Sequence, residues 1–179
     1  PLFPEGFRHD VQVIATVLSV DNNCEPDIVA MNGASAALSL SDIPFDGPIG
    51  GVKVGYVDEE FVINPDEETR EESKLDLTVA GTEEAVLMVE AGADEIPEDI
   101  MLDAIEFAHE KIKEIIQFQK EIVGEMDIEK CDFTPDQINR QLEKEVRDYI
   151  TDDLKDAIQT FEKLERNQKI DSVKERTMD

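Results

Sequence analysis

The sequence contains no tryptophan, only two histidines and two cysteines, and few basic residues for its length. Its 179 residues include 17 Lys and Arg against 44 Asp and Glu, which gives a formal net charge of -27. Phosphate backbones are bound by clustered Lys and Arg, so this balance argues against a general binder of nucleic acid or of an anionic membrane surface. Any contact with RNA or DNA would need a local basic patch or another part of the molecule.

Long apolar runs are also missing. No stretch approaches the ~18 apolar residues needed to cross a bilayer, and no basic-then-apolar leader opens the chain. We therefore expect a cytoplasmic location and no membrane partner. Cys24 and Cys131 have no Cys or His neighbour at zinc-ligand spacing, so two reduced thiols are expected. The chain starts with PLFPEGF rather than Met, and we expect it to be an internal segment of a longer protein.

The first half of the sequence predicts β-strands around one helix. Residues 11–20 (VQVIATVLSV) are apolar at both odd and even positions, which is typical of a strand covered on both faces. Residues 52–56 and 61–64 flank a polar turn and predict one hairpin, and residues 75–80 and 85–91 predict a second. The run AVLMVEA suggests burial on both faces, so we expect the second hairpin to be central in the sheet.

A helix of small residues follows the first predicted strand. Pro26 suits its first position, and small side chains then recur at helical spacing at Ala30, Gly33, Ala34 and Ala37. Such side chains let another backbone approach closely, so we expect this helix to be enclosed within the fold. Two prolines a few residues later prevent it from continuing.

The second half predicts helices. Residues 97–123 carry an amphipathic stripe over several turns. Thr134 and Pro135 suit the cap and first turn of another helix, whose apolar positions continue at helical spacing to Leu164. Residues 167–179 predict a further helix with little to bury. Because the strand pattern ends before these helices, we expect a domain boundary between residues 124 and 133.

Several blocks, in this order and spacing, resemble a known family: PLFPEGF, VQVIATVLSVD, PDIVAMNGASAALSLSDIPFDGPIG, LDLTVAGTEEAVLMVE and AIEFAHE. They are similar to the first core domain of bacterial polynucleotide phosphorylases, also called polyribonucleotide nucleotidyltransferases. The resemblance implies an α+β fold with a partial ribonuclease PH-like domain, a mixed sheet with packed helices, at residues 1–124. Residues 125–179 are similar in placement and pattern to part of the all-helical linker domain.

The resemblance also implies an activity for the full-length protein. The family's enzymes are cytoplasmic homotrimers that shorten RNA from its 3′ end with inorganic phosphate and Mg²⁺, and the reverse reaction makes polymer. Their catalytic centre belongs to the second core domain, which we expect beyond Asp179, and an Arg-rich RNA loop would precede Pro1. We therefore expect this segment to be a non-catalytic scaffold that binds no cofactor itself.

Two positions bear on whether this domain could still catalyse. In the active copy a Gly-Ser-rich turn before the small-residue helix holds phosphate, but Cys24–Asp27 reads CEPD, where two carboxylates repel phosphate and proline removes an N–H donor. The active copy also carries metal-binding aspartates before the strand that starts at Leu75. The matching residues read EESKLD: Lys74 stands where one Asp is expected, and Asp76 alone is a poor Mg²⁺ site. We expect no catalytic, phosphate-binding or metal-binding residue; contacts with RNA stay undecided.

Other polar positions have simpler interpretations. The acidic run of residues 66–72 lacks the pattern of a calcium loop and predicts a solvated loop. His9 is expected at the surface, and His109 at the margin of the apolar stripe. Arg8 and Lys53 could touch RNA phosphate, but weak salt bridges are the expected role.

A function of another class stays open. The protein could be a free-standing acidic interaction module without enzymatic activity, using its helical half to bind a partner. The mixed charges of residues 143–148 and 163–166 are typical of a solvated helix face, and they are equally compatible with a binding surface.

Overall fold

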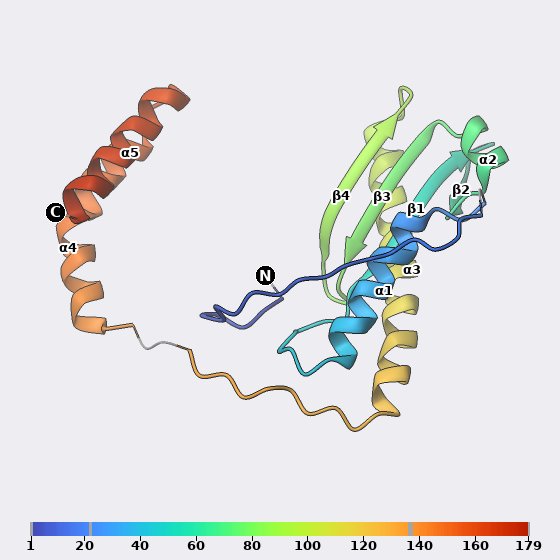
Figure 1. Ribbon diagram of the computed structural model, residues 1–179. Helices are drawn as coiled ribbons and strands as arrows, with labels where there is room; N and C mark the ends of the chain where they lie inside the picture. Colours follow the sequence, from blue (N-terminus) through green and yellow to red (C-terminus); the bar gives the residue numbers. More distant parts are fainter. Residues whose placement is uncertain (1, 22, 136–137, 179) are drawn as a thin grey trace. The chain divides into compact units, whose positions relative to one another are not determined.

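The computed structural model describes residues 2–21, 23–135 and 138–178. These residues form two compact units, Pro1–Thr134 and Pro135–Asp179. The first unit is α+β and the second contains helices, in agreement with the expected fold class (Figure 1). Within the described residues, no helix combines the length and the apolar character needed to cross a membrane.

The first unit is built around one four-stranded antiparallel sheet with strand order β2-β1-β3-β4, so its described strands do not form the mixed sheet we expected. Its elements, in chain order, are α1 (Pro26–Leu40), β1 (Gly50–Val57), β2 (Glu60–Ile63), α2 (Glu67–Glu72), β3 (Leu75–Gly81), β4 (Val86–Ala93) and α3 (Glu98–Gly124).

Both predicted hairpins are confirmed. β1 and β2 are joined by Asp58 and Glu59, whose φ angles of 49° and 64° give the left-handed turn that matches the twist of paired strands. β3 and β4 are joined by a turn at residues 82–85, with a register shift at Ala80 and Gly81. Apolar runs on either side of a short polar turn were therefore a sufficient signal for local strand pairing.

The core lies between the sheet and α3. Every fourth residue along the helix is buried: Ala104, Ala108, Ile112 and Ile116. They pack against buried side chains of β1 and β3, namely Val52, Val54, Leu75, Leu77 and Val79. Burying these apolar groups is the main stabilising term of the unit.

The free edge of β1 is completed by two asparagines. β2 pairs only with the second half of β1, so Gly51 and Lys53 have no strand neighbour on that side. Asn32 on α1 accepts from the N–H of Gly51 and donates to its carbonyl, both at 2.9 Å. Asn64 supplies both partners of Lys53: its side-chain Oδ1 accepts from the Lys53 N–H at 2.9 Å, and its backbone N–H donates to the Lys53 carbonyl at 2.8 Å. The two asparagines therefore continue the ladder where β2 ends.

The residue before β1 is held in the same way. The Ile49 N–H donates to Ser35 Oγ at 2.9 Å, and its carbonyl accepts from Gln119 Nε2 at 2.8 Å. Ser35 and Gln119 are both buried, on α1 and α3 respectively. These polar contacts fix both helices against the start of β1, because a buried backbone group without a partner is costly.

Residues 11–20 do not form the predicted strand. The segment is extended but unpaired, and it runs along α1 with its side chains largely exposed, Ile14 at 75% and Leu18 at 93% (Figure 1). A strand needs a neighbouring strand to bond with, and no described strand lies beside this one. Apolar character predicted an extended backbone correctly but could not supply the partner.

The small-residue helix is enclosed on one side only. The face of α1 that meets the sheet is formed by Ile28, Ser35 and Ser39, while Gly33 and Ala37 on the predicted close-approach face are exposed. That face lines a groove against residues 13–21. The expectation of a fully enclosed helix was wrong, because hydroxyl and aliphatic side chains, rather than the glycine–alanine stripe, make the contact.

β4 is an edge strand, so the prediction that the second hairpin lies centrally was wrong for one of its two strands. β3 is central, and its apolar residues are buried. Leu87 and Val89 of β4 are each 46% exposed, because α3 packs over β1, β2 and β3 rather than over β4.

The expectation that residues 66–72 form a solvated loop was also wrong. They contain α2, which Asp66 caps by accepting from the Thr69 N–H at 2.9 Å.

The second unit contains α4 (Arg140–Ile158) and α5 (Lys163–Met178). Asn139, rather than Thr134, is the N-cap of α4: its Oδ1 accepts from two backbone N–H groups of the first turn. The helix predicted to continue to Leu164 is interrupted between the two. Arg176 of α5 forms an ion pair with Asp153 of α4, which joins them.

Candidate functional site

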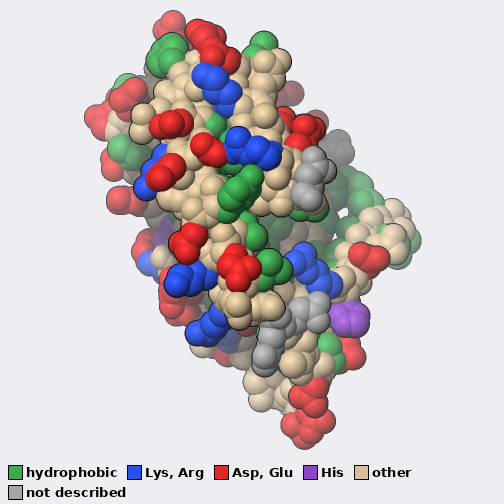
Figure 2. Space-filling model, turned by 90° about the vertical axis from the view of Figure 1, so that its left-hand side faces the viewer, with side chains coloured by type: hydrophobic (Ala, Val, Ile, Leu, Met, Phe, Trp, Pro, Cys, Tyr) green, Lys and Arg blue, Asp and Glu red, His purple; other side chains and the backbone are tan. Residues whose placement is uncertain are grey.

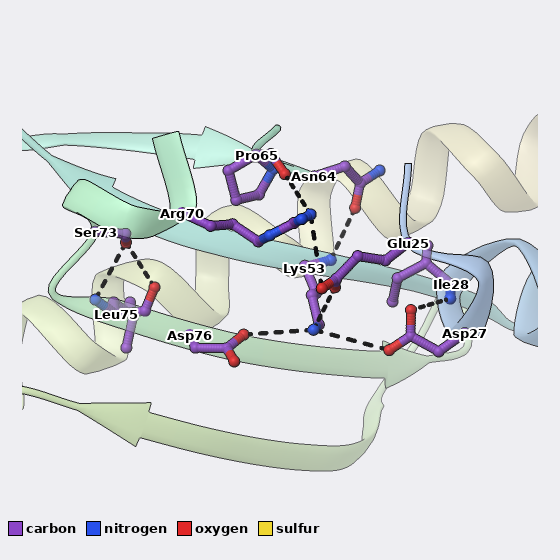
Figure 3. Close-up of polar contacts among 10 residues, drawn as sticks. All are labelled: Glu25, Asp27, Ile28, Lys53, Asn64, Pro65, Arg70, Ser73, Leu75 and Asp76. Carbon is purple, nitrogen blue, oxygen red and sulfur yellow. Dashed lines mark hydrogen bonds and ion pairs between the residues drawn. The ribbon is translucent and has the colours of Figure 1, made fainter. Parts of the chain in front are cut away.

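Charged side chains from three elements converge at the N-terminus of α1, over the face of the sheet that lies opposite α3 (Figure 3). Lys53 projects from the middle of β1, and only 14% of its side chain is exposed. Its ammonium forms an ion pair with Glu25, and lies 3.8 Å from Asp27 Oδ2 and 3.6 Å from Asp76 Oδ1. One cation therefore faces carboxylates from both α1 and β3.

Glu25 is held between two cations. One of its carboxylate oxygens pairs with Lys53, and the other lies 3.6 Å from the Arg70 guanidinium on α2. Arg70 also donates to the Pro65 carbonyl at 3.2 Å, which ties α2 to the end of β2. Glu25 is the N-cap residue of α1 but caps no backbone N–H with its side chain. Its carboxylate is used for these ion pairs instead.

Lys53 stays ionised. Partial burial lowers the pKa of an ammonium, but the hydrogen bond to Glu25 and the charges of Asp76, Glu25 and Asp27 outweigh that effect, so the pKa of Lys53 is raised above its usual value. The group is thus a permanent cation at neutral pH.

Ser73 positions the strand that carries Asp76. Its Oγ accepts from the Tyr56 N–H at 2.8 Å. It also accepts from the Leu75 N–H at 3.2 Å and donates to the Leu75 carbonyl at 2.7 Å (Figure 3). This hydroxyl therefore links the end of β1 to the start of β3 and places Asp76 one residue further along, toward Lys53.

The cluster is nearly balanced within itself, with two cations, Lys53 and Arg70, against three carboxylates, Glu25, Asp27 and Asp76. An added anion would meet the carboxylate of Glu25, and an added cation would meet the ammonium of Lys53. Among the described residues, no group of three or more His, Cys, Asp or Glu side chains is arranged to hold a metal ion. The arrangement is suited to holding α1, β1, α2 and β3 together.

The structure brings together the two positions that the sequence singled out. Residues 24–27 and Asp76 meet at the Lys53 ammonium, although about fifty residues separate them in the chain. Lys74 is exposed and its N–H donates to the Tyr56 carbonyl at 3.1 Å. The sequence patterns did not predict that Lys53 lies at the centre of this charge cluster. The available signal was a single charged residue within the otherwise uncharged strand GGVKVGYV.

The two histidines lie outside this cluster. His9 is exposed and its ring lies 5.3 Å from the Phe7 ring. His109 Nε2 is 2.9 Å from the Thr82 carbonyl, so it contacts the β3–β4 turn from α3. The cysteines, Cys24 and Cys131, are both free and exposed. On the face drawn in Figure 2, acidic side chains are spread widely, with Lys and Arg scattered among them.

Comparison with known proteins gives this geometry a context. A family model described as "3′ exoribonuclease family, domain 2" matches residues 47–111, which include β1 to β4 and half of α3. The polyribonucleotide nucleotidyltransferase of Halothermothrix orenii is 67% identical over 178 residues, 99% of this chain. The chain is homologous to a segment of the polyribonucleotide nucleotidyltransferases. The family resemblance seen in the sequence is thereby confirmed.

Other polyribonucleotide nucleotidyltransferases agree. That of Clostridioides difficile is 57% identical over 178 residues, and that of Staphylococcus carnosus is 55% identical over 177 residues. In each case the chain spans about a quarter of the relative's length, 25%. Among solved structures, rice Rrp46 aligns with a TM-score of 0.53 at 16% identity, covering 59% of this chain and 51% of that one. The last likeness concerns the fold alone.

Proposed function

We propose that this chain is a non-catalytic scaffold segment of a phosphate-dependent 3′-to-5′ exoribonuclease, a polyribonucleotide nucleotidyltransferase that degrades RNA. The observation that carries the proposal is the 67% identity over 99% of the chain to an enzyme of that name. The full-length protein would be cytoplasmic and trimeric, use Mg²⁺ and inorganic phosphate, and act on RNA.

The charge cluster supports the proposal that this segment is not catalytic. Phosphorolysis needs an anion site for phosphate beside a metal site, with donors and ligands left open for them. At the N-terminus of α1 the Glu25 carboxylate lies where an anion would approach, and Lys53 lies between the carboxylates that a metal would need. No catalytic, phosphate-binding or metal-binding residue is proposed in this segment.

The proposed domain assignment follows the resemblance. Residues 1–124 would be part of the first ribonuclease PH-like domain, and residues 125–179 part of the all-helical linker domain. In the full-length enzyme the first would contribute to the ring wall and the trimer contacts, and the second would set the spacing of the catalytic domain.

A phosphorolysis assay tests the proposal. The chain is incubated with oligo(A), Mg²⁺ and inorganic phosphate, and ADP release is compared with a reaction without phosphate. We expect no phosphate-dependent ADP from this chain, and phosphate-dependent ADP from a longer polypeptide that includes the second core domain. In that longer polypeptide Asp76→Asn should leave the rate within about twofold. ADP from the chain alone, or loss of activity on Asp76→Asn, would place the chemistry in this segment.

The alternative, a free-standing acidic interaction module, rests on the second unit. α4 exposes apolar side chains at helical spacing, including Leu142 at 57% and Ile158 at 55%. Such a face could bind a partner helix. If the longer polypeptide showed no phosphorolysis under any condition, this alternative would gain.

A further inference from the structure

The outer edge of β4 is a free pairing surface. β4 is the last strand in the order β2-β1-β3-β4 and forms its ladder with β3 alone. Within the described residues of the first unit, no backbone pairs with its other side, and Figure 1 shows it at the border of the sheet. Its eight residues extend over about 27 Å at ~3.4 Å per residue, long enough for a full ladder with another strand.

The side chains of β4 do not protect this edge. Natural edge strands are usually short, or carry lysine, proline or an inward-pointing charge that opposes pairing. β2, at the opposite border, has only four residues. β4 reads VLMVEAGA, with neither lysine nor proline, and its apolar side chains are open to solvent: Leu87 46%, Met88 38% and Val89 46%. Glu90 is its one charge.

Both faces of the strand would contribute to pairing. Val89 lies opposite Val79 in the ladder, so it is on the face that carries the core, yet it is half-exposed because α3 does not reach over it. Met88 lies opposite Ala80 on the other face. A strand added beside β4 would therefore find apolar neighbours at alternate positions on each face.

The charges around β4 indicate which strand would fit. Glu83 and Glu84 precede it, Glu90 lies within it, and Asp94 and Glu95 follow it. Lys120 forms an ion pair with Glu83, but among the described residues no ion pair involves any of the other four carboxylates. Two copies of β4 paired antiparallel would bring acidic ends together, and the net charge of -27 adds to that repulsion. A basic partner would be attracted at both ends.

We propose that the outer edge of β4 binds an extended segment of another protein by strand addition. The segment is about eight residues long, carries apolar or β-branched side chains at alternate positions, and has Lys or Arg at both ends. Main-chain hydrogen bonds to β4 provide the affinity, and the acidic residues at its ends select a basic segment. This proposal does not depend on the enzymatic assignment.

The test uses a fluorescein-labelled peptide, Lys-Arg-Val-Thr-Val-Thr-Arg-Lys, titrated with the 179-residue chain at 150 mM salt and followed by anisotropy. A control peptide of equal charge has proline in place of the second valine and the threonine that follows it, which removes one N–H donor on each edge of the peptide and so prevents pairing by either edge. We expect the control to bind at least about tenfold more weakly. Amide chemical-shift changes in NMR spectra should cluster along residues 86–93.

Matched protein variants separate pairing at β4 from general attraction to an acidic protein. Glu90→Lys and Glu60→Lys change charge equally, and both glutamates are exposed on border strands. Glu90→Lys should weaken peptide binding at least about fivefold, and Glu60→Lys by less than about twofold, with native-like NMR spectra for both. Equal binding of the two peptides, equal effects of the two variants, or shifts centred on β2 or on a helix would each overturn the proposal.

Discussion

Replacing Asn32 with alanine should destabilise the first unit more than any exposed substitution. The Asn32 amide makes two hydrogen bonds of 2.9 Å to the buried backbone of Gly51 and thereby stands in for the strand that β1 lacks at this point. Alanine has no polar group to replace it. The Gly51 N–H and carbonyl would both lose their partner, while the fold around them keeps them away from water.

The magnitude follows from those two groups. An unsatisfied buried donor or acceptor costs about 1–3 kcal/mol, and water reaching part of the vacated space will recover some of it. We expect the free energy of unfolding to fall by about 2–4 kcal/mol. With a urea slope of about 2 kcal/mol/M, the unfolding midpoint should move down by about 1–2 M.

Urea unfolding followed by far-UV circular dichroism measures the change, and hydrogen exchange at the Gly51 amide reports it locally. Asn23→Ala, at an exposed position just before α1, is the control and should shift the midpoint little. If Asn32→Ala cost less than about 0.5 kcal/mol while the Gly51 amide stayed protected, the amide would not be completing the edge of β1, and the reasoning would fail.

Three further predictions concern the core, a helix end and a surface ion pair. Ile112→Ala, at a fully buried position on α3, should cost about 2–5 kcal/mol in urea unfolding, whereas Leu102→Ala, 62% exposed on the same helix, should cost less than about 0.5; equal losses would contradict the assigned core. Lys130 donates to three carbonyls at the end of α1, at 3.0, 3.0 and 2.7 Å, so Lys130→Ala should cost about 1 kcal/mol by the same assay, and no loss would mean that the contact is not formed in solution. The hydrogen bond from Lys120 lowers the pKa of Glu83, so this pair stabilises the fold above the unfolded-state pKa and the contribution is lost as the pH falls through the folded-state pKa. Lys120→Gln should raise that pKa toward its usual value in a carboxyl NMR titration, with Lys174→Gln on α5 as the control that should not.

The local elements were predictable because their signals lie within a few residues. Apolar runs on either side of a short polar turn are enough to define the β1–β2 and β3–β4 hairpins, and a four-residue repeat from Ala104 to Ile116 is enough to define the buried face of α3. The order of the blocks also carried the family resemblance, since the same residues recur in relatives at 67% and 57% identity. From its residue types the turn Cys24–Asp27 is likewise predicted not to bind phosphate, and this stays a prediction.

The charge cluster around Lys53 could be identified only from the tertiary structure. Glu25, Lys53 and Asp76 are spread over about fifty residues, and only the antiparallel pairing of β1 with β3, together with the packing of α1 beside β1, brings them within ion-pair distance. No local pattern encodes that distance. Lys53 looked like a weak surface charge in the sequence, but the fold leaves it 14% exposed among three carboxylates.

Composition determined the acidic character of the chain, and local patterns indicated most of its strands and helices. Neither could decide which strand lies at the edge of the sheet. Residues 11–20 and 86–93 carry equally apolar sequences, yet the first finds no partner strand among the described residues and the second finds one on a single side. Burial depends on what packs from elsewhere in the chain, and that is a property of the tertiary structure rather than of the segment.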